Sequence, residues 1–265
     1  MKRFLTLVTT LAAVACARYF PDTATWHRPQ LPWASTSSTN CDAKFVNGKA
    51  PTLPVKLQKD AEKLCYTSFA VLHSPVSRTP LWAAEVLGDD AVKAARQIDR
   101  ASSFEPDARL KTSDRAELSD YLRSGYDRGH LAPSGDMPDH KAQAESFYLS
   151  NIVPQAARLN RGSWADLESS VRDKAVADGR LYIVTGVLFQ GASVQTTPSG
   201  RVIIPSSLWK AIASPGHGAI VKMASNSDDP QWRSMSLAEF QAETGIDPFP
   251  GLDPDSRKKK LNIGY

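Results

Sequence analysis

The residues between Asp127 and Glu168 offer the side chains that phosphodiester hydrolysis requires. Asp127-Arg128-Gly129-His130 supplies a carboxylate, a guanidinium and an imidazole within four positions, and Asn160 and Glu168 follow downstream. An imidazole can act as a general base, and amide or carboxylate oxygens can hold a hard cation or its bound waters. Arginine supplies positive charge for phosphate oxygens. Together these residue types predict metal-dependent cleavage of phosphodiester bonds.

His130 is the candidate base. A neutral imidazole near pH 7 can accept a proton from a water that attacks phosphorus, whereas lysine and arginine remain protonated. The other histidines lack such neighbours, so polar surface or structural roles are expected for His27, His73, His140 and His217.

Length and composition predict one globular domain. The chain has 265 residues, of which 42% are hydrophobic, and this is enough for one substantial core. Residues 1–17 have the charged start and short apolar stretch of a signal peptide. Residues 18–54 are rich in Pro, Ser, Thr and Asn without periodicity, so an irregular arm is expected before a single nuclease domain at 55–265.

The leader predicts export to the periplasm or secretion. Its apolar run from Phe4 to Ala17 is too short to cross a bilayer comfortably, so no membrane span is expected. Small residues offer cleavage sites just before Cys16 or Arg18. Lipid attachment at Cys16 is the alternative, although Ala13 stands where a lipoprotein signal usually has leucine.

Cysteine usage fits an oxidising compartment. Beyond Cys16 the chain has only Cys41 and Cys65, an even pair that predicts a disulfide. Two separate buried thiols are the alternative, because the sequence does not show how closely the two residues approach. Neither CxxC nor HExxH spacing occurs, so a zinc site has little support.

The net charge is small. It is +4 for the whole chain, and removing Lys2 and Arg3 leaves 30 basic against 28 acidic residues. Nucleic-acid binding therefore requires a local concentration of positive charge. The arginines in or near the motif region provide one: Arg123, Arg128, Arg158, Arg161 and Arg172. Residues 257–260 form a second basic cluster with the character of a solvated tail.

Apolar segments predict an α+β fold whose sheet has about five or six strands flanked by helices. Two strands that pair with each other are expected at 66–73 and 81–87. Further strands are expected at 147–149, 181–184, 202–204 and 219–221. A helix is predicted at 160–177, where a core stripe recurs at helical spacing: Trp164, Leu167, Val171 and Ala175. A second helix is predicted between a capping box at Ser236 and a terminator at Gly245.

Four ordered motifs resemble those of the DNA/RNA non-specific endonuclease family, which includes secreted bacterial nucleases and mitochondrial endonuclease G. Asp127-Arg128-Gly129-His130 is followed by Asn151-Ile-Val-Pro-Gln155 and by Leu159-Asn160-Arg161-Gly162-x-Trp164-x-x-Leu167-Glu168. Similar stretches include Arg100-x-x-x-Phe104-x-Pro106-Asp107, and the likeness spans roughly 66–251. The order and separation of the motifs make the resemblance specific.

The resemblance implies a ββα-metal nuclease fold with a central, mainly antiparallel sheet. His130 would be the general base, on a strand or loop beside the helix that begins near Asn160. Asn160 matches the direct metal ligand of the family. A neutral amide oxygen suits Mg²⁺, which keeps most of its waters when few protein groups bind it, and Mn²⁺ is the alternative ion.

Glu168 would anchor metal-bound water, with a solvent-facing carboxylate as the alternative. The eight-residue separation places Asn160 and Glu168 near the same side of the predicted helix. Asp127 has two interpretations, orienting neighbouring groups or supporting the turn at Gly129. Trp164 is expected to lie in the core, with a platform for base stacking as the alternative.

Further residues are expected to contact phosphate or to position the catalytic groups. Arg128 would stabilise charge that develops at phosphorus, and Arg100 resembles a second phosphate-binding arginine. Asn151 and Gln155 would hold His130, the metal waters or the scissile phosphate, and Arg161 is expected to bind substrate.

The expected substrates are DNA and RNA, cut with low sequence specificity, because the chain has no helix-turn-helix, zinc-finger or RRM pattern. The resemblance implies endonucleolytic cleavage to 5′-phosphate and 3′-hydroxyl ends, and a homodimer would fit the family. Two other classes stay open. A phosphodiesterase or pyrophosphatase for small nucleotides would have a deep closed pocket. A non-catalytic nucleic-acid-binding or uptake protein would not need His130, Asn160 and Glu168 together.

Overall fold

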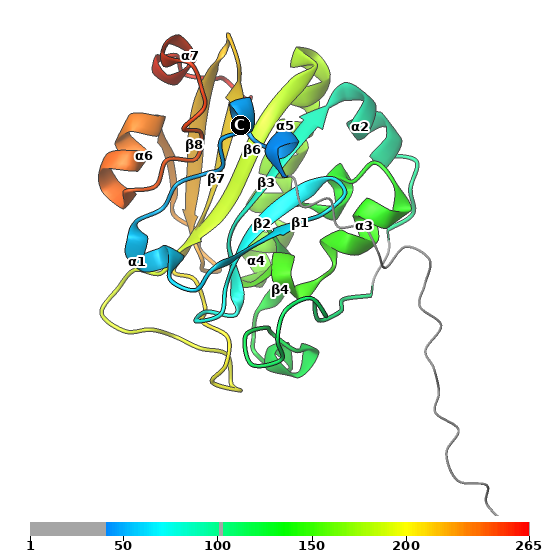
Figure 1. Ribbon diagram of the computed structural model, residues 1–265, viewed down its shortest axis with the longest axis vertical. Coiled ribbons are helices and arrows are strands. Elements are labelled where there is room, and N and C mark those ends of the chain that lie inside the picture. The colour runs from blue at the N-terminus through cyan, green and yellow to red at the C-terminus, as the bar shows by residue number, and fades with distance from the viewer. Residues whose placement is uncertain (1–40, 101–102, 265) are drawn as a thin grey trace, which may run out of the picture. The chain divides into compact units, whose positions relative to one another are not determined.

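A seven-stranded antiparallel sheet runs through the computed structural model, which describes residues 41–100 and 103–264 (Figure 1). Every described residue belongs to one compact unit, Ser37–Tyr265. The strands, in spatial order, are β1 (Glu62–Cys65), β2 (Phe69–Ser74), β3 (Thr79–Gly88), β6 (Arg180–Leu188), β7 (Ser207–Ser214), β8 (Gly218–Ser225) and β9 (Trp232–Met235). The predicted α+β class is confirmed, with more strands than expected.

A separate two-stranded ribbon pairs β4 (Asp127–His130) with β5 (Ile152–Gln155). The α-helices are α1 (Val55–Gln58), α2 (Asp89–Ala95), α3 (His140–Ser146), α4 (Ala157–Arg161), α5 (Ser163–Asp178), α6 (Leu237–Thr244) and α7 (Pro254–Lys258). The 3₁₀ helices are η1 (Asp42–Lys44), η2 (Val46–Gly48), η3 (Leu118–Tyr121), η4 (Ser134–Asp136) and η5 (Leu149–Asn151).

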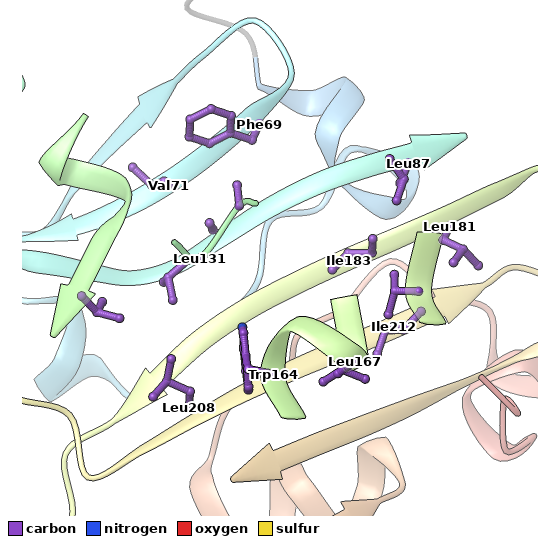
Figure 2. Close-up of a cluster of buried hydrophobic side chains, with 14 of the residues drawn as sticks. Phe69, Val71, Leu87, Leu131, Trp164, Leu167, Leu181, Ile183, Leu208 and Ile212 are labelled. Carbon is purple, nitrogen blue, oxygen red and sulfur yellow. The ribbon is translucent and has the colours of Figure 1, made fainter. Parts of the chain in front are cut away.

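The large sheet is buried on both faces, because its central strands are apolar at consecutive positions. Successive side chains of a strand point to opposite faces, so Phe69 and Val71 join one core while Ala70 joins the other. The first core packs the sheet against α5 and the β4–β5 ribbon, and Figure 2 shows Trp164 and Leu167 beside Ile183 of β6. The second core packs the opposite face against Cys41, Phe45, Val46 and helix α6. The ribbon that carries the site residues is therefore fixed to a rigid sheet.

Helix α5 has the predicted core stripe: Trp164, Leu167, Val171 and Ala175 are buried. The prediction of one continuous helix from Asn160 is wrong, since Asn160 lies on α4 and Gly162 separates the two helices. Gly162 has φ −108° and ψ −115°, a conformation that side chains with a Cβ avoid, and an added Cβ would lie 2.7 Å from the Arg158 carbonyl oxygen.

The helix predicted between Ser236 and Gly245 is confirmed as α6. The Ser236 hydroxyl accepts a hydrogen bond from the Glu239 amide, and the Glu239 carboxylate accepts one from the Ser236 amide. Gly245 ends the helix with φ +71°, in the left-handed region that glycine adopts readily.

Two predicted strands are absent from the described residues. Phe147 ends α3 and Leu149 begins η5, so 147–149 forms no strand, and its apolar side chains fill the core from helical turns. Of residues 202–204, only Ile203 forms an isolated bridge, with Thr196. The pairs at 66–73 and 81–87 and the strands at 181–184 and 219–221 are confirmed as parts of β2, β3, β6 and β8.

The predicted disulfide between Cys41 and Cys65 is present, with Cα atoms 5.5 Å apart. It joins the start of η1 to the end of β1. The leader at 1–17, the lipid-attachment alternative at Cys16 and residues 18–40 of the expected arm lie outside the described residues. In the part of the chain that the structure describes, no helix has the length and apolar character to cross a membrane.

Candidate active site

Strand β4 consists of the four motif residues and pairs with β5 so that Asp127 faces Gln155 and His130 faces Ile152. Gly129 is required by the closeness of the two strands. A Cβ at this position would lie 2.6 Å from the Cβ of Gln155 and would also overlap its amide oxygen. Any larger residue would push β4 away from β5 and displace His130.

His130 ends β4 in a nearly closed aromatic pocket, with 8% of its surface exposed. Its ring centroid lies 4.8 Å from that of Phe147 and 5.5 Å from that of Phe104. The Nε2 atom is buried and has no hydrogen-bond partner among the described residues. The ring is therefore held by packing while one of its nitrogens is not engaged by another protein group.

Burial, and secondarily the positive charge of Arg100, lowers the pKa of His130 to about 3. The imidazole is therefore neutral at physiological pH. A neutral imidazole can accept a proton, which is the state that a general base requires.

The lowered pKa of His130 predicts that the free energy of unfolding falls on acidification. Above the unfolded pKa of 6.5 neither state binds a proton at His130, whereas below it only the unfolded chain does, until the folded pKa near 3 is reached. From pH 7.5 to pH 5, wild type should lose about 2 kcal/mol more than His130→Gln. Urea unfolding in EDTA at both pH values measures this difference. Equal losses would mean that the pKa of folded His130 is ordinary.

Asp127, at the other end of β4, binds Asn160 and Arg161 of helix α4. Its Oδ2 accepts hydrogen bonds from Asn160 Nδ2 at 2.9 Å and from Arg161 Nε at 2.7 Å. Although burial opposes it, these bonds hold the pKa of Asp127 below its ordinary value. Of the two interpretations of Asp127, the geometry fits the first, since the carboxylate orients neighbouring groups.

The bond to Asp127 determines which way the Asn160 amide points. An ionised carboxylate can only accept hydrogen bonds, so the atom that faces it must be the amide nitrogen. The Asn160 oxygen is thereby turned away from Asp127, and it accepts no hydrogen bond from the described residues. It is the oxygen that could contact a cation.

The donor set fits a metal ion that keeps most of its waters. Within residues 41–100 and 103–264, no group of three or more His, Cys, Asp or Glu side chains is arranged to hold a metal ion. One neutral amide oxygen beside an ionised carboxylate matches the preference of Mg²⁺ for oxygen ligands and retained waters. Zinc, which takes three or four nitrogen, sulfur or carboxylate ligands, does not fit this arrangement.

Arg128 and Arg100 flank His130 through the two phenylalanines that enclose it. The guanidinium carbon of Arg128 lies 4.4 Å from the Phe104 ring centroid, and that of Arg100 lies 5.4 Å from the Phe147 centroid. Both arginines are exposed, and such cation–π contacts orient a guanidinium without occupying its N–H groups. The structure thus places both predicted phosphate-binding arginines against the phenylalanine rings that contact His130.

Asn151 holds the chain that follows His130. Its Oδ1 accepts a hydrogen bond from the Ala132 amide, and its Nδ2 donates to the carbonyl oxygens of Ala132 and Ser146. The side chain is fully buried, so its contribution to the site is to fix the backbone next to His130. Gln155 is also fully buried, lies against Gly129 and has no hydrogen-bond partner among the described residues for either side-chain atom.

Arg161 is not a free cation, because its guanidinium forms an ion pair with Asp127, although its side chain is 73% exposed. Glu168 lies on α5, beyond the break at Gly162, so the argument that one helix aligns it with Asn160 fails. Burial raises the pKa of Glu168 to about 7, with Asp136 raising it further and Lys210 and Arg172 opposing the rise. Glu168 thus belongs to a charged cluster with Asp136, Arg172 and Lys210, between α5 and the sheet.

Phe104 and Phe147 were not identified as site residues from the sequence. Phe104 is part of the Arg100-x-x-x-Phe104 motif, and this co-occurrence with an arginine was the available signal. Phe147 offered none, since its apolar neighbours predicted a strand. Both rings reach His130 through tertiary packing alone.

The chain belongs to the DNA/RNA non-specific endonuclease family, whose sequence model matches residues 47–255. A mitochondrial nuclease EXOG of Danio rerio is 30% identical over 216 residues, covering 74% of this chain and 63% of the relative. A nuclease of Nostoc sp. is 30% identical over 221 residues, covering 76% and 78%. This chain thus spans about three fifths of the length of the mitochondrial EXOG relatives from fish and frog.

The crystal structure of the EndoG/EndoGI complex contains a chain with the same fold. The two superpose with a TM-score of 0.66 at 24% sequence identity, covering 76% of this chain and 92% of that one. This similarity confirms the predicted fold.

Proposed function

We propose that this protein is a metal-dependent endonuclease that hydrolyses the phosphodiester bonds of DNA and RNA without sequence specificity. The observation that carries the proposal is the pairing of two groups on one short strand. His130, neutral and with Nε2 unpaired, ends β4, while Asp127 begins it and orients the Asn160 oxygen. Three strand steps separate Asp127 from His130, so their Cα atoms lie about 10 Å apart.

In this proposal His130 accepts a proton from a water as the water attacks phosphorus. Burial keeps the imidazole neutral in the free protein but also lowers its affinity for a proton. The negative charge of a bound phosphate would raise that affinity again. Arg128 and Arg100 bind non-bridging phosphate oxygens and stabilise the charge that develops on them. Asn151 fixes the backbone next to His130, and the Gln155 side chain packs against Gly129.

Asn160 would hold the ion through its amide oxygen, and Asp127 would hold waters of the ion's hydration shell. When bound there, hydrated Mg²⁺ would polarise a phosphate oxygen, stabilise negative charge on the leaving 3′ oxygen and supply that oxygen with a proton from a bound water, giving 5′-phosphate and 3′-hydroxyl ends. The resemblance to the family supports Glu168 as an anchor for metal-bound water. In the structure its charged neighbours are Asp136, Arg172 and Lys210.

Two hollows in the described part bear on the alternative of a small-nucleotide phosphodiesterase. A cavity of about 240 Å³ is lined by residues that include Glu85, Asp136 and Arg180, and a hollow of about 660 Å³ lies between β9 and α6. Neither is lined by His130 or Asn160. The exposed arginines near His130 favour a polymer, which binds through its backbone phosphates, over a small enclosed ligand.

Export to the periplasm or the outside of the cell is part of the proposal. The Cys41–Cys65 disulfide supports it, since such bonds persist in oxidising compartments.

The test is cleavage of supercoiled plasmid DNA and of single-stranded RNA by the purified, disulfide-bonded protein. With Mg²⁺ we expect plasmid nicking, then linearisation, and RNA degradation, and with EDTA we expect no cleavage of either polymer. End-labelling after phosphatase treatment identifies the 5′-phosphate. Cleavage that persists in EDTA would exclude the metal. Folded protein that binds but does not cut either polymer would favour the binding-only alternative.

A further inference from the structure

The turn that leads into β4 exposes an aliphatic and a cationic side chain next to each other. Leu122 is 68% exposed, and Arg123 beside it is also exposed. Asp127 follows four residues after Arg123, so the turn adjoins the strand that carries His130; in Figure 1 this segment is part of the green loop below the β4 label.

The backbone of this turn is one that arginine adopts at a cost. The Ser124 amide donates to the Tyr121 carbonyl oxygen at 3.3 Å, Leu122 has φ −65° and ψ 125°, and Arg123 has φ +54°. These values match a type II turn, whose third residue is normally glycine because φ is positive there. An arginine held in this conformation is an outlier of the kind that clusters at functional sites.

Hydrogen bonds and an ion pair fix the two residues that precede Leu122. The Tyr121 hydroxyl donates to the Ile152 carbonyl oxygen of β5 at 3.2 Å. Asp120 accepts a hydrogen bond from the Glu117 amide at 2.8 Å and lies 3.5 Å from the guanidinium of Arg201. The exposure of Leu122 and Arg123 is therefore built into the fold, because the residues just before them are anchored to the site ribbon.

We propose that this turn, Leu122-Arg123, is a contact surface for the nucleic-acid strand that enters the active site. Arg123 pairs with a backbone phosphate, and Leu122 packs against the sugar and base edge next to it. Continuity with the site supports this occupant: Tyr121 lies close enough to Arg128 for the charge of Arg128 to act on its hydroxyl. Aliphatic wedges flanked by arginines are a common means of engaging nucleic acid. The inference rests on the proposed nuclease function.

The two side chains are expected to leave different signatures. Arg123→Gly replaces the arginine with the residue that the turn favours, so Tm should be unchanged or higher. Its Kd for DNA should rise about tenfold at low salt, and the slope of log Kd against log salt should shrink by about one. Leu122→Ala should raise KM about tenfold with an unchanged salt slope, because it removes an uncharged contact. Val55→Ala, at another exposed aliphatic residue, is the matched control.

Fluorescence anisotropy with labelled DNA and RNA oligonucleotides, in Ca²⁺ to slow cleavage, and initial rates on both polymers give these values. The inference would be overturned if both variants had the Kd, KM and salt slope of wild type. It would also be overturned if activity fell only through kcat, or only together with a fall in Tm. Effects as large in Val55→Ala would also overturn it. Absence of polymer cleavage by wild type would instead remove the proposed function on which the inference rests.

Discussion

His130→Gln is expected to lower kcat for DNA and RNA about a thousandfold while Kd for DNA stays within about twofold of wild type. Glutamine fills much of the space between Phe104 and Phe147, but it cannot accept a proton as an imidazole does. The phosphate contacts proposed for Arg128 and Arg100 do not require the imidazole, so binding should persist. Rates on plasmid and RNA, with anisotropy for binding, measure the two effects separately.

The matched control is His73→Gln, because His73 is also buried and its Nε2 contacts the Asp114 carbonyl oxygen away from the site. This variant should lose stability and keep kcat. Near-wild-type cleavage by His130→Gln would refute the assignment of the base. A matching loss of kcat in folded His73→Gln would show that the effect comes from burial and not from catalysis.

Asn160→Ala is expected to raise the Mg²⁺ concentration for half-maximal cleavage at least about tenfold and to lower the rate at saturating Mg²⁺. The substitution removes the amide oxygen that is turned away from Asp127 and also the hydrogen bond that orients it. Asn160→Asp separates the two losses, since it keeps an oxygen but sets a second carboxylate against Asp127. It should retain more activity than the alanine variant and less than wild type.

Magnesium titrations of the cleavage rate measure this effect, with Asn262→Ala as a control at an exposed asparagine that forms no contact with Asp127. The Asn262→Ala curve should overlay wild type. An unchanged Mg²⁺ requirement in Asn160→Ala would place the cation on other groups, and the Glu168 cluster would be the next to test.

Local sequence patterns predicted those parts of the fold that depend on near neighbours. Helix α6 followed from a capping box and a terminal glycine, whose hydrogen bonds join residues three or four apart. The core stripe of α5 followed from helical periodicity. Strand β7 was missed because Lys210 interrupts its apolar run, yet this lysine is buried and donates to Thr185 of the neighbouring strand.

The sequence alone predicted the chemistry that we propose for the site, because an imidazole, arginines and an amide oxygen in ordered motifs are the groups that phosphodiester cleavage requires. Only the tertiary structure decided how these groups are set. The break at Gly162 places Glu168 and Asn160 on different helices. Phe104 and Phe147 pack against His130. The hydrogen bond to Asp127 orients the Asn160 amide. Those outcomes depend on contacts between residues 17 to 33 positions apart or on a backbone conformation at one glycine. Sequence periodicity reports which face of an element is buried, and it carries no information about which distant side chain arrives there.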